Sequence, residues 1–72
     1  MSIMAAPRRH EFAYYGPKLD VLVEAATAWC TEHDCTLEVV PLLRGARLRI
    51  SGPESAVSQA IREVRTWIRS AR

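Results

Sequence analysis

Arginine is concentrated in the second half of the sequence, where it could neutralise phosphate groups. Residues 44–72 contain seven arginines and two glutamates, whereas residues 1–43 contain three basic and six acidic residues. A guanidinium group suits phosphate, carboxylate and aromatic partners, and phosphate neutralisation dominates non-specific affinity for nucleic acids. A solvated surface or a general preference for arginine would explain the same composition. The isoelectric point of about 8.8 leaves these explanations open, because it is below the value expected of a dedicated nucleic-acid-binding domain.

The spacing assigns these arginines to two kinds of element. Side chains three and four residues apart share one flank of a helix; those with this spacing are Arg62, Arg65, Arg69 and Arg72. Arg47 and Arg49 are two apart and would share one face of a strand, with Arg44 in the turn before them.

A second pattern is the pair Gly16-Pro17 and Gly52-Pro53, each of which precedes a predicted helix. Helix N-termini attract anions. If the first and third strands were parallel neighbours, both N-termini would lie at one end of the sheet, close to Lys18. Asp20 and Glu54 oppose an anion there, and ordinary helix entry accounts for Gly-Pro without a ligand. We favour helix entry.

A third pattern is Cys30, His33 and Cys35. Cys30 and His33 fall on one helix face, but the spacing matches no common zinc motif. We expect a buried thiol and a helix-end histidine, with no metal and no cofactor. The sequence also lacks a phosphate-binding glycine loop, a metalloprotease or nucleophile-elbow motif and a plausible triad, so we expect no enzyme.

The hydrophobic periodicity indicates the elements that position these residues. It predicts a strand at 10–15, a helix at 17–33, a strand at 35–43, a turn at 44–46, a strand from 47 that Gly52-Pro53 ends, and a helix at 53–69. This order predicts an α+β two-layer sandwich, a three-stranded sheet with both helices on one face. Residues 10–72 would form the domain, and residues 1–9 a flexible tail.

The apolar faces predict the core. On the first helix the core-facing residues are Leu19, Leu22, Val23, Ala26, Trp29 and Cys30, and in the last strand and helix they are Leu48, Ile50, Val57, Ile61, Val64 and Ile68. Phe12 and Tyr14 would face the core from the first strand. Val21, Ala25 and Ala28 widen the apolar arc of the first helix, either as a packing surface between subunits or as plain helix formers.

Several segments together resemble a KH-type RNA-binding domain. They are Tyr15-Gly16, Leu37-Glu-Val39, Arg44-Gly45, Leu48-Arg-Ile50-Ser-Gly52 and Glu54 with Ala56-Val57. The chain is most similar to the reduced KH-like module that opens PhoH-family ATPases, over roughly residues 12–70. The resemblance implies the same fold and RNA binding. Two features depart from it: Gly16-Pro-Lys-Leu19 lacks the second glycine of the KH signature loop, and these 72 residues include no ATPase domain.

These observations favour a small non-enzymatic module that binds RNA or single-stranded nucleic acid. The candidate contacts are Gly16, Lys18, Arg44, Arg47, Arg49, Arg62, Arg65 and Arg69. The alternative is a protein–protein interaction module, a homodimer or a small regulator, favoured by the apolar arc, the charge asymmetry and the residues Trp29 and Trp67. We expect a cytoplasmic protein without a membrane partner, because no run of about 18 apolar residues occurs and the start lacks the features of a signal peptide.

Overall fold

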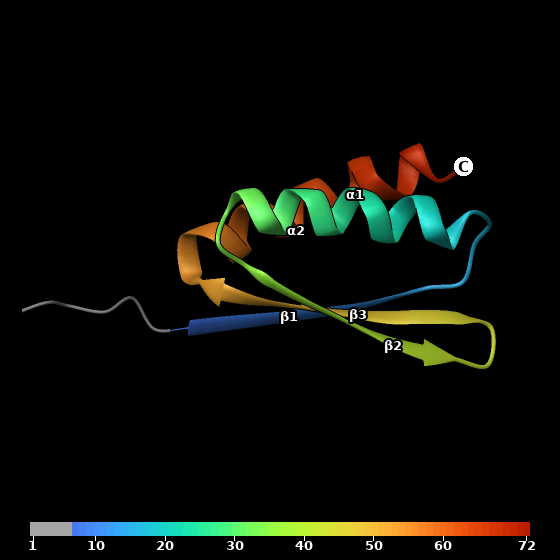
Figure 1. Ribbon diagram of the computed structural model, residues 1–72, viewed down its shortest axis with the longest axis horizontal. Helices are drawn as coiled ribbons and strands as arrows, with labels where there is room; N and C mark the ends of the chain where they lie inside the picture. Colours follow the sequence, from blue (N-terminus) through green and yellow to red (C-terminus); the bar gives the residue numbers. More distant parts are fainter. Residues whose placement is uncertain (1–6) are drawn as a thin grey trace, which may run out of the picture.

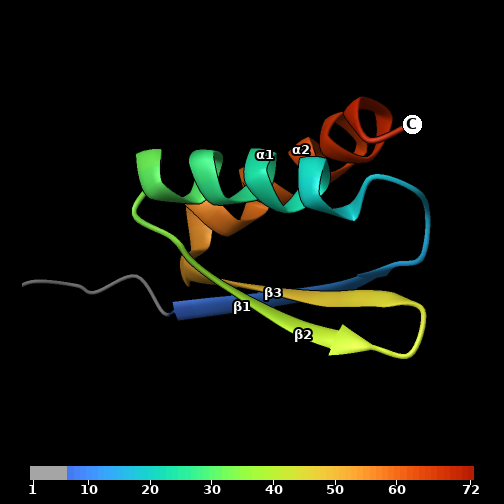
Figure 2. The same ribbon diagram turned by 45° about the vertical axis from the view of Figure 1, so that its right-hand side comes forward.

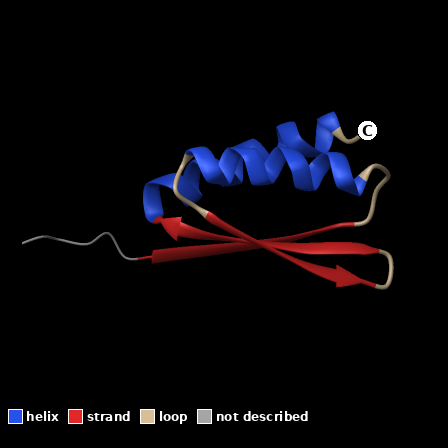
Figure 3. Ribbon diagram, viewed as in Figure 1, coloured by secondary structure: helices blue, strands red, loops and turns tan. Residues whose placement is uncertain are grey.

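Two helices cover one face of a three-stranded antiparallel sheet (Figures 1 and 3). The computed structural model describes residues 7–72. Its elements are β1 Pro7–Tyr14, α1 Leu19–Glu32, β2 Thr36–Leu42, β3 Gly45–Pro53 and α2 Glu54–Ser70. Turning the molecule by 45° keeps both helices on the same side of the sheet (Figure 2). The predicted order of elements and the α+β two-layer sandwich are therefore confirmed.

β3 is the central strand, and β1 and β2 pair with it antiparallel on either side. Pro41 lies in β2 opposite Ala46. Proline has no N–H to donate to a second neighbouring strand, so it is expected in an edge strand, and β2 is an edge strand.

β1 begins three residues earlier than the sequence indicated. Pro7, Arg8 and Arg9 pair with Pro53, Gly52 and Ser51, the end of β3. The prediction of a flexible tail is wrong for these three residues, because cross-strand pairing extends the strand beyond its apolar alternation. The rest of that tail, residues 1–6, lies outside the described part of the chain.

Both helices begin slightly later than predicted. Pro17 was expected to open α1, but Lys18 is its N-cap in the left-handed conformation, with φ 55°, and its carbonyl accepts from the amides of Val21 and Leu22. The hydroxyl of Tyr14 donates to the carbonyl of Pro17 at 2.9 Å and fixes the connection before the helix.

The core lies between β3 and the two helices. Ala46, Leu48 and Ile50 alternate along β3 and are buried, whereas Arg47 and Arg49 point to the uncovered face. Leu22 and Val57 meet them from the helices with no exposed surface. The predicted core residues are all buried or partly buried against it: Phe12, Tyr14, Leu19, Leu22, Val23, Ala26, Trp29, Cys30, Leu48, Ile50, Val57, Ile61, Val64 and Ile68.

The two tryptophans join the helices. Trp67 is 4% exposed, and the ring of Trp29 meets it edge to face, with centroids 6.0 Å apart and an interplanar angle of 64°. Such aromatic pairs add about 0.5–1.5 kcal/mol to their buried area. Trp29 itself is only half-buried, so one tryptophan belongs to the core and the other to its border.

The central position of Leu48 predicts a large effect on stability. Leu48→Ala should lower the free energy of unfolding by about 2–5 kcal/mol, out of roughly 4–11 kcal/mol expected for a chain of this length. Urea unfolding followed by circular dichroism measures the difference. Leu43→Ala is the matched control, because Leu43 is 100% exposed in the hairpin turn and its loss should be nearly neutral. Equal effects of the two substitutions would contradict this packing.

Candidate nucleic-acid interface

The eight predicted contact residues lie in four places. Gly16 and Lys18 are in the β1–α1 connection and Arg44 is in the β2–β3 turn. Arg47 and Arg49 lie on the uncovered face of the sheet, and the contacts on α2 are Arg62, Arg65 and Arg69. The sheet separates Arg47 and Arg49 from α2, so the eight residues do not form one surface.

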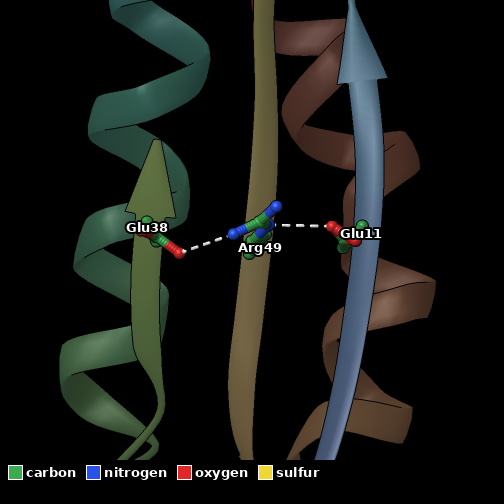
Figure 4. Close-up of polar contacts among 3 residues, drawn as sticks. All are labelled: Glu11, Glu38 and Arg49. Atoms are coloured by element: carbon green, nitrogen blue, oxygen red, sulfur yellow. Dashed lines mark hydrogen bonds and ion pairs between the residues drawn. The ribbon is translucent and has the colours of Figure 1, made fainter. Parts of the chain in front are cut away.

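Arg49 is engaged within the sheet (Figure 4). Its Nε donates to Oε1 of Glu11 at 2.8 Å, and its Nη1 donates to Oε1 of Glu38 at 3.3 Å. Both glutamates stand directly opposite Arg49 in the strand register. The hydrogen bond to Glu11, then that to Glu38, raises the pKa of Arg49. The three side chains carry a net charge of −1, which disfavours phosphate, so Arg49 is a poor candidate contact.

Three arginines on α2 and one just beyond its end form what we call the arginine ridge. They are Arg62, Arg65, Arg69 and Arg72. All four are exposed, and within residues 7–72 the only ion pairs are those of Arg49. With about 100° of rotation per residue, Arg62, Arg65 and Arg69 fall within about 60° of one another on the flank away from the buried Ala60 and Trp67. The ridge is thus an uncompensated positive stripe.

Arg8 extends the ridge from the neighbouring strand. Its Nη1 donates to Oγ of Ser58 at 2.9 Å, across 50 residues of sequence. Ser58 shares the flank of the ridge arginines on the helical wheel. Sequence reasoning missed Arg8 because it placed the residue in the tail; the alternation of β1, continued back from Phe12, would have turned it toward the helices.

The opposite side of the helix layer is acidic. α2 contacts β1, whereas α1 contacts β2, so the two helices lie over different edges of the sheet. Asp20, Glu24 and Glu32 are exposed on α1. A polyanion would therefore be attracted to the α2 and β1 side of the molecule and repelled from the α1 side.

A second group of cations lies at one end of the sheet. The β1–α1 connection, the β2–β3 hairpin and the C-terminal end of α2 are at the same end of the molecule (Figure 1). Lys18 and Arg44 belong to these segments and are exposed. Tyr15, 65% exposed, adds an aromatic surface there. These residues place further positive charge at the end of the molecule where α2 ends.

Gly16 has a structural explanation. A Cβ on this residue would lie 2.5 Å from Oη and 2.6 Å from Cζ of Tyr14. Only glycine lets the buried Tyr14 ring reach the carbonyl of Pro17. The need for glycine here thus follows from packing and requires no ligand.

The two helix N-termini do not form a common anion site. β1 and β3 run antiparallel, so α1 starts beside the Tyr14 and Ala46 end of the sheet, and α2 starts beside Pro53 at the other end. The shared site required parallel strands, and this condition is not met.

Cys30, His33 and Cys35 lie close together at the end of α1, but each has a local role. Nδ1 of His33 donates to the carbonyl of Trp29 at 2.8 Å. Both cysteines are unpaired. Burial, and then Cys35, raises the pKa of Cys30 from 9.0 to about 11, and burial together with Asp34 raises the pKa of Cys35. No group of three or more possible metal ligands occurs within the part of the chain described.

Comparisons with models of protein families, with curated proteins and with solved structures found no match to this chain. The similarity to KH domains therefore stays a prediction from sequence. Among residues 7–72, neither helix is long and apolar enough to cross a bilayer. What the protein binds must be inferred from its own side chains.

The buried thiol of Cys30 predicts a loss of stability in alkali. Below about pH 9 the folded and unfolded chains both keep this proton, so the thiol has no effect. Above that, the unfolded chain releases the proton while the folded chain holds it until about pH 11. The free energy of unfolding should therefore fall between pH 9 and 11. Urea unfolding between pH 9 and 11 should show a smaller fall in the free energy of unfolding for Cys30→Ala than for the unmodified protein. An identical pH dependence of the two proteins would contradict this role of Cys30.

Proposed function

We propose that this protein is a non-enzymatic module that binds RNA or another single-stranded nucleic acid along the arginine ridge. The observation that carries the proposal is the exposure of Arg62, Arg65, Arg69 and Arg72 with no carboxylate of residues 7–72 within ion-pair distance. Arginines that serve only to solubilise a small domain are commonly interspersed with acidic residues. Here five acidic residues lie on α1 and around Arg49, and within residues 7–72 the two glutamates of α2, Glu54 and Glu63, form no ion pair with the ridge.

The ridge has the dimensions of a contact with a phosphate backbone. Helical residues rise 1.5 Å each, so successive ridge arginines are displaced by about 4.5–6 Å along the axis. Such contacts would position a strand without reading its sequence. If all four guanidinium groups neutralise phosphates, the logarithm of the binding constant should fall with the logarithm of salt concentration with a slope of about −2.8.

The KH-like resemblance supports RNA as the ligand but favours a different surface. The loop at Gly16-Pro-Lys-Leu19 lacks a second glycine, and Lys18 serves as the N-cap of α1. The acidic exposed face of α1 would repel a backbone laid beside it. We therefore place the strand on α2 and β1, with Lys18 and Arg44 as secondary contacts. Arg47 lies on the uncovered face of the sheet, outside this surface. We place the protein in the cytoplasm, where unpaired thiols such as Cys30 stay reduced.

Reversing charge on the ridge should remove binding. Arg62→Glu with Arg65→Glu should lower the affinity for a mixed single-stranded RNA about tenfold or more at low salt and reduce the salt slope to about −1.4. Fluorescence anisotropy at several salt concentrations measures both quantities.

The matched control is Arg9→Glu with Arg47→Glu. It changes the net charge equally, but on the uncovered face of the sheet. We expect this variant to keep the slope of the unmodified protein. Absence of binding by the unmodified protein at low salt would exclude the proposed function, and equal losses in the two double variants would exclude the ridge as its site.

A protein–protein interaction module is the second candidate. Val21 is 37% exposed and, with Glu24, Ala25 and Ala28, lines a shallow hollow of about 250 Å³ on the outer side of α1. An exposed apolar surface on a helix is a common feature of interfaces. A homodimer or a small regulator of a larger complex would use this surface rather than the ridge.

Sedimentation of the purified protein tests that alternative. A homodimer predicts a mass above the 8.1 kDa of the monomer that persists at moderate salt and returns to the monomer value with Val21→Glu. Thr27→Glu, an exposed position of α1 outside the hollow, should leave the mass unchanged. A monomeric mass for the unmodified protein would leave only a heterologous partner for this surface.

A further inference from the structure

A hollow of about 290 Å³ lies between the two helices, and it is lined by Trp29, His33, Gln59, Arg62 and Glu63. Its volume is near the lower limit of small-ligand sites, roughly 300 Å³. Resting on the proposed function, we propose that this hollow holds one nucleobase of the strand whose phosphates lie on the arginine ridge. The base would be one that donates N–H groups from its edge.

The first argument is the aromatic pair in the lining. The rings of Trp29 and His33 are stacked, with centroids 3.8 Å apart and an interplanar angle of 11°. The edge contact with the buried Trp67 holds the indole from the other helix. Trp29 and His33 are both half-buried. A rigid, partly exposed aromatic surface next to a positive stripe is the combination that single-strand binding proteins use.

The second argument is the set of polar groups around those rings. A carbonyl oxygen only accepts, so Nδ1 of His33 carries the proton that it donates to Trp29. Nε2 of a neutral His33 is then left as an acceptor. Gln59 supplies an amide that both donates and accepts, and Glu63 supplies a carboxylate. Nucleobase edges present the complementary groups.

The carboxylate of Glu63 also indicates which part of a nucleotide would enter. A phosphate in the hollow would face this negative charge, whereas a base with N–H donors could bind to it. Guanine is the sharpest probe, because two neighbouring N–H donors on its Watson–Crick edge match the two oxygens of one carboxylate.

Arg62 connects the hollow to the ridge. It lines the hollow and is also the first of the four ridge arginines along α2. A phosphate held by Arg62 would place the attached nucleoside at the mouth of the hollow, and the following phosphates could continue toward Arg65 and Arg69. One surface would thus combine backbone contacts with a single base contact.

The test compares two nine-nucleotide oligouridylates, one with a central guanosine and one with a central abasic site, by fluorescence anisotropy at low salt. The protein should bind the guanosine strand about tenfold more tightly, because stacking and edge contacts are lost with the base. Glu63→Ala should reduce this ratio to about five, because stacking on Trp29 and His33 remains while the edge contact is lost. Glu24→Ala removes the same charge from α1 outside the hollow and should keep the ratio.

The outcomes separate the two proposals. If both strands bind equally with a steep salt dependence, the ridge binds phosphates and the base site is overturned. If neither strand binds, the proposed function fails, and the hollow is tested alone by nuclear magnetic resonance. Guanosine 5′-monophosphate should then shift the side-chain signals of Trp29 and His33 while ribose 5-phosphate does not. Equal effects of the two compounds would overturn the base site as well.

Discussion

The pairing of β3 on both sides, with every second side chain buried, is the constraint on which the rest of the structure depends. Leu48 and Ile50 have no exposed surface, and a shift of one residue in register would turn both to solvent. The side chains of Leu48 and Ile50 point to one face of the sheet, and this is the face that α1 and α2 must cover. The direction of these side chains also fixes the opposite direction of Arg47 and Arg49, and so decides which arginines can act together.

This division sorts the arginines by environment. Arg49 stands between Glu11 and Glu38 on paired strands, where each partner is held by the register of the sheet. The ridge arginines stand on a helix whose neighbouring element contributes Arg8 and no carboxylate within ion-pair distance. Arginines that are equivalent in the sequence therefore differ in their capacity to bind an anion. The strands beside Arg49 supply two carboxylates, whereas the strand beside the ridge supplies none within ion-pair distance.

The sequence predicted the parts of the fold that depend on local periodicity. The apolar positions of α2 and the edge position of the Pro41 strand follow from spacing or from the chemistry of one residue. The start of β1 at Pro7, the antiparallel direction of β1 and the partners of Arg49 depend on pairing between distant segments. No local pattern specifies that pairing, so the two glutamates that engage Arg49 could not be predicted from the sequence.

The direction of α2 gives the ridge a polarity. The helix dipole places partial positive charge at its start and partial negative charge at its end. Arg69 lies in the last turn and Arg72 just beyond it, so both partly compensate the unpaired carbonyl groups there. Arg62 lies nearer the middle of the helix and its charge is less compensated. A bound chain would therefore be held most firmly at Arg62, next to the hollow between the helices, and more loosely near the C-terminus.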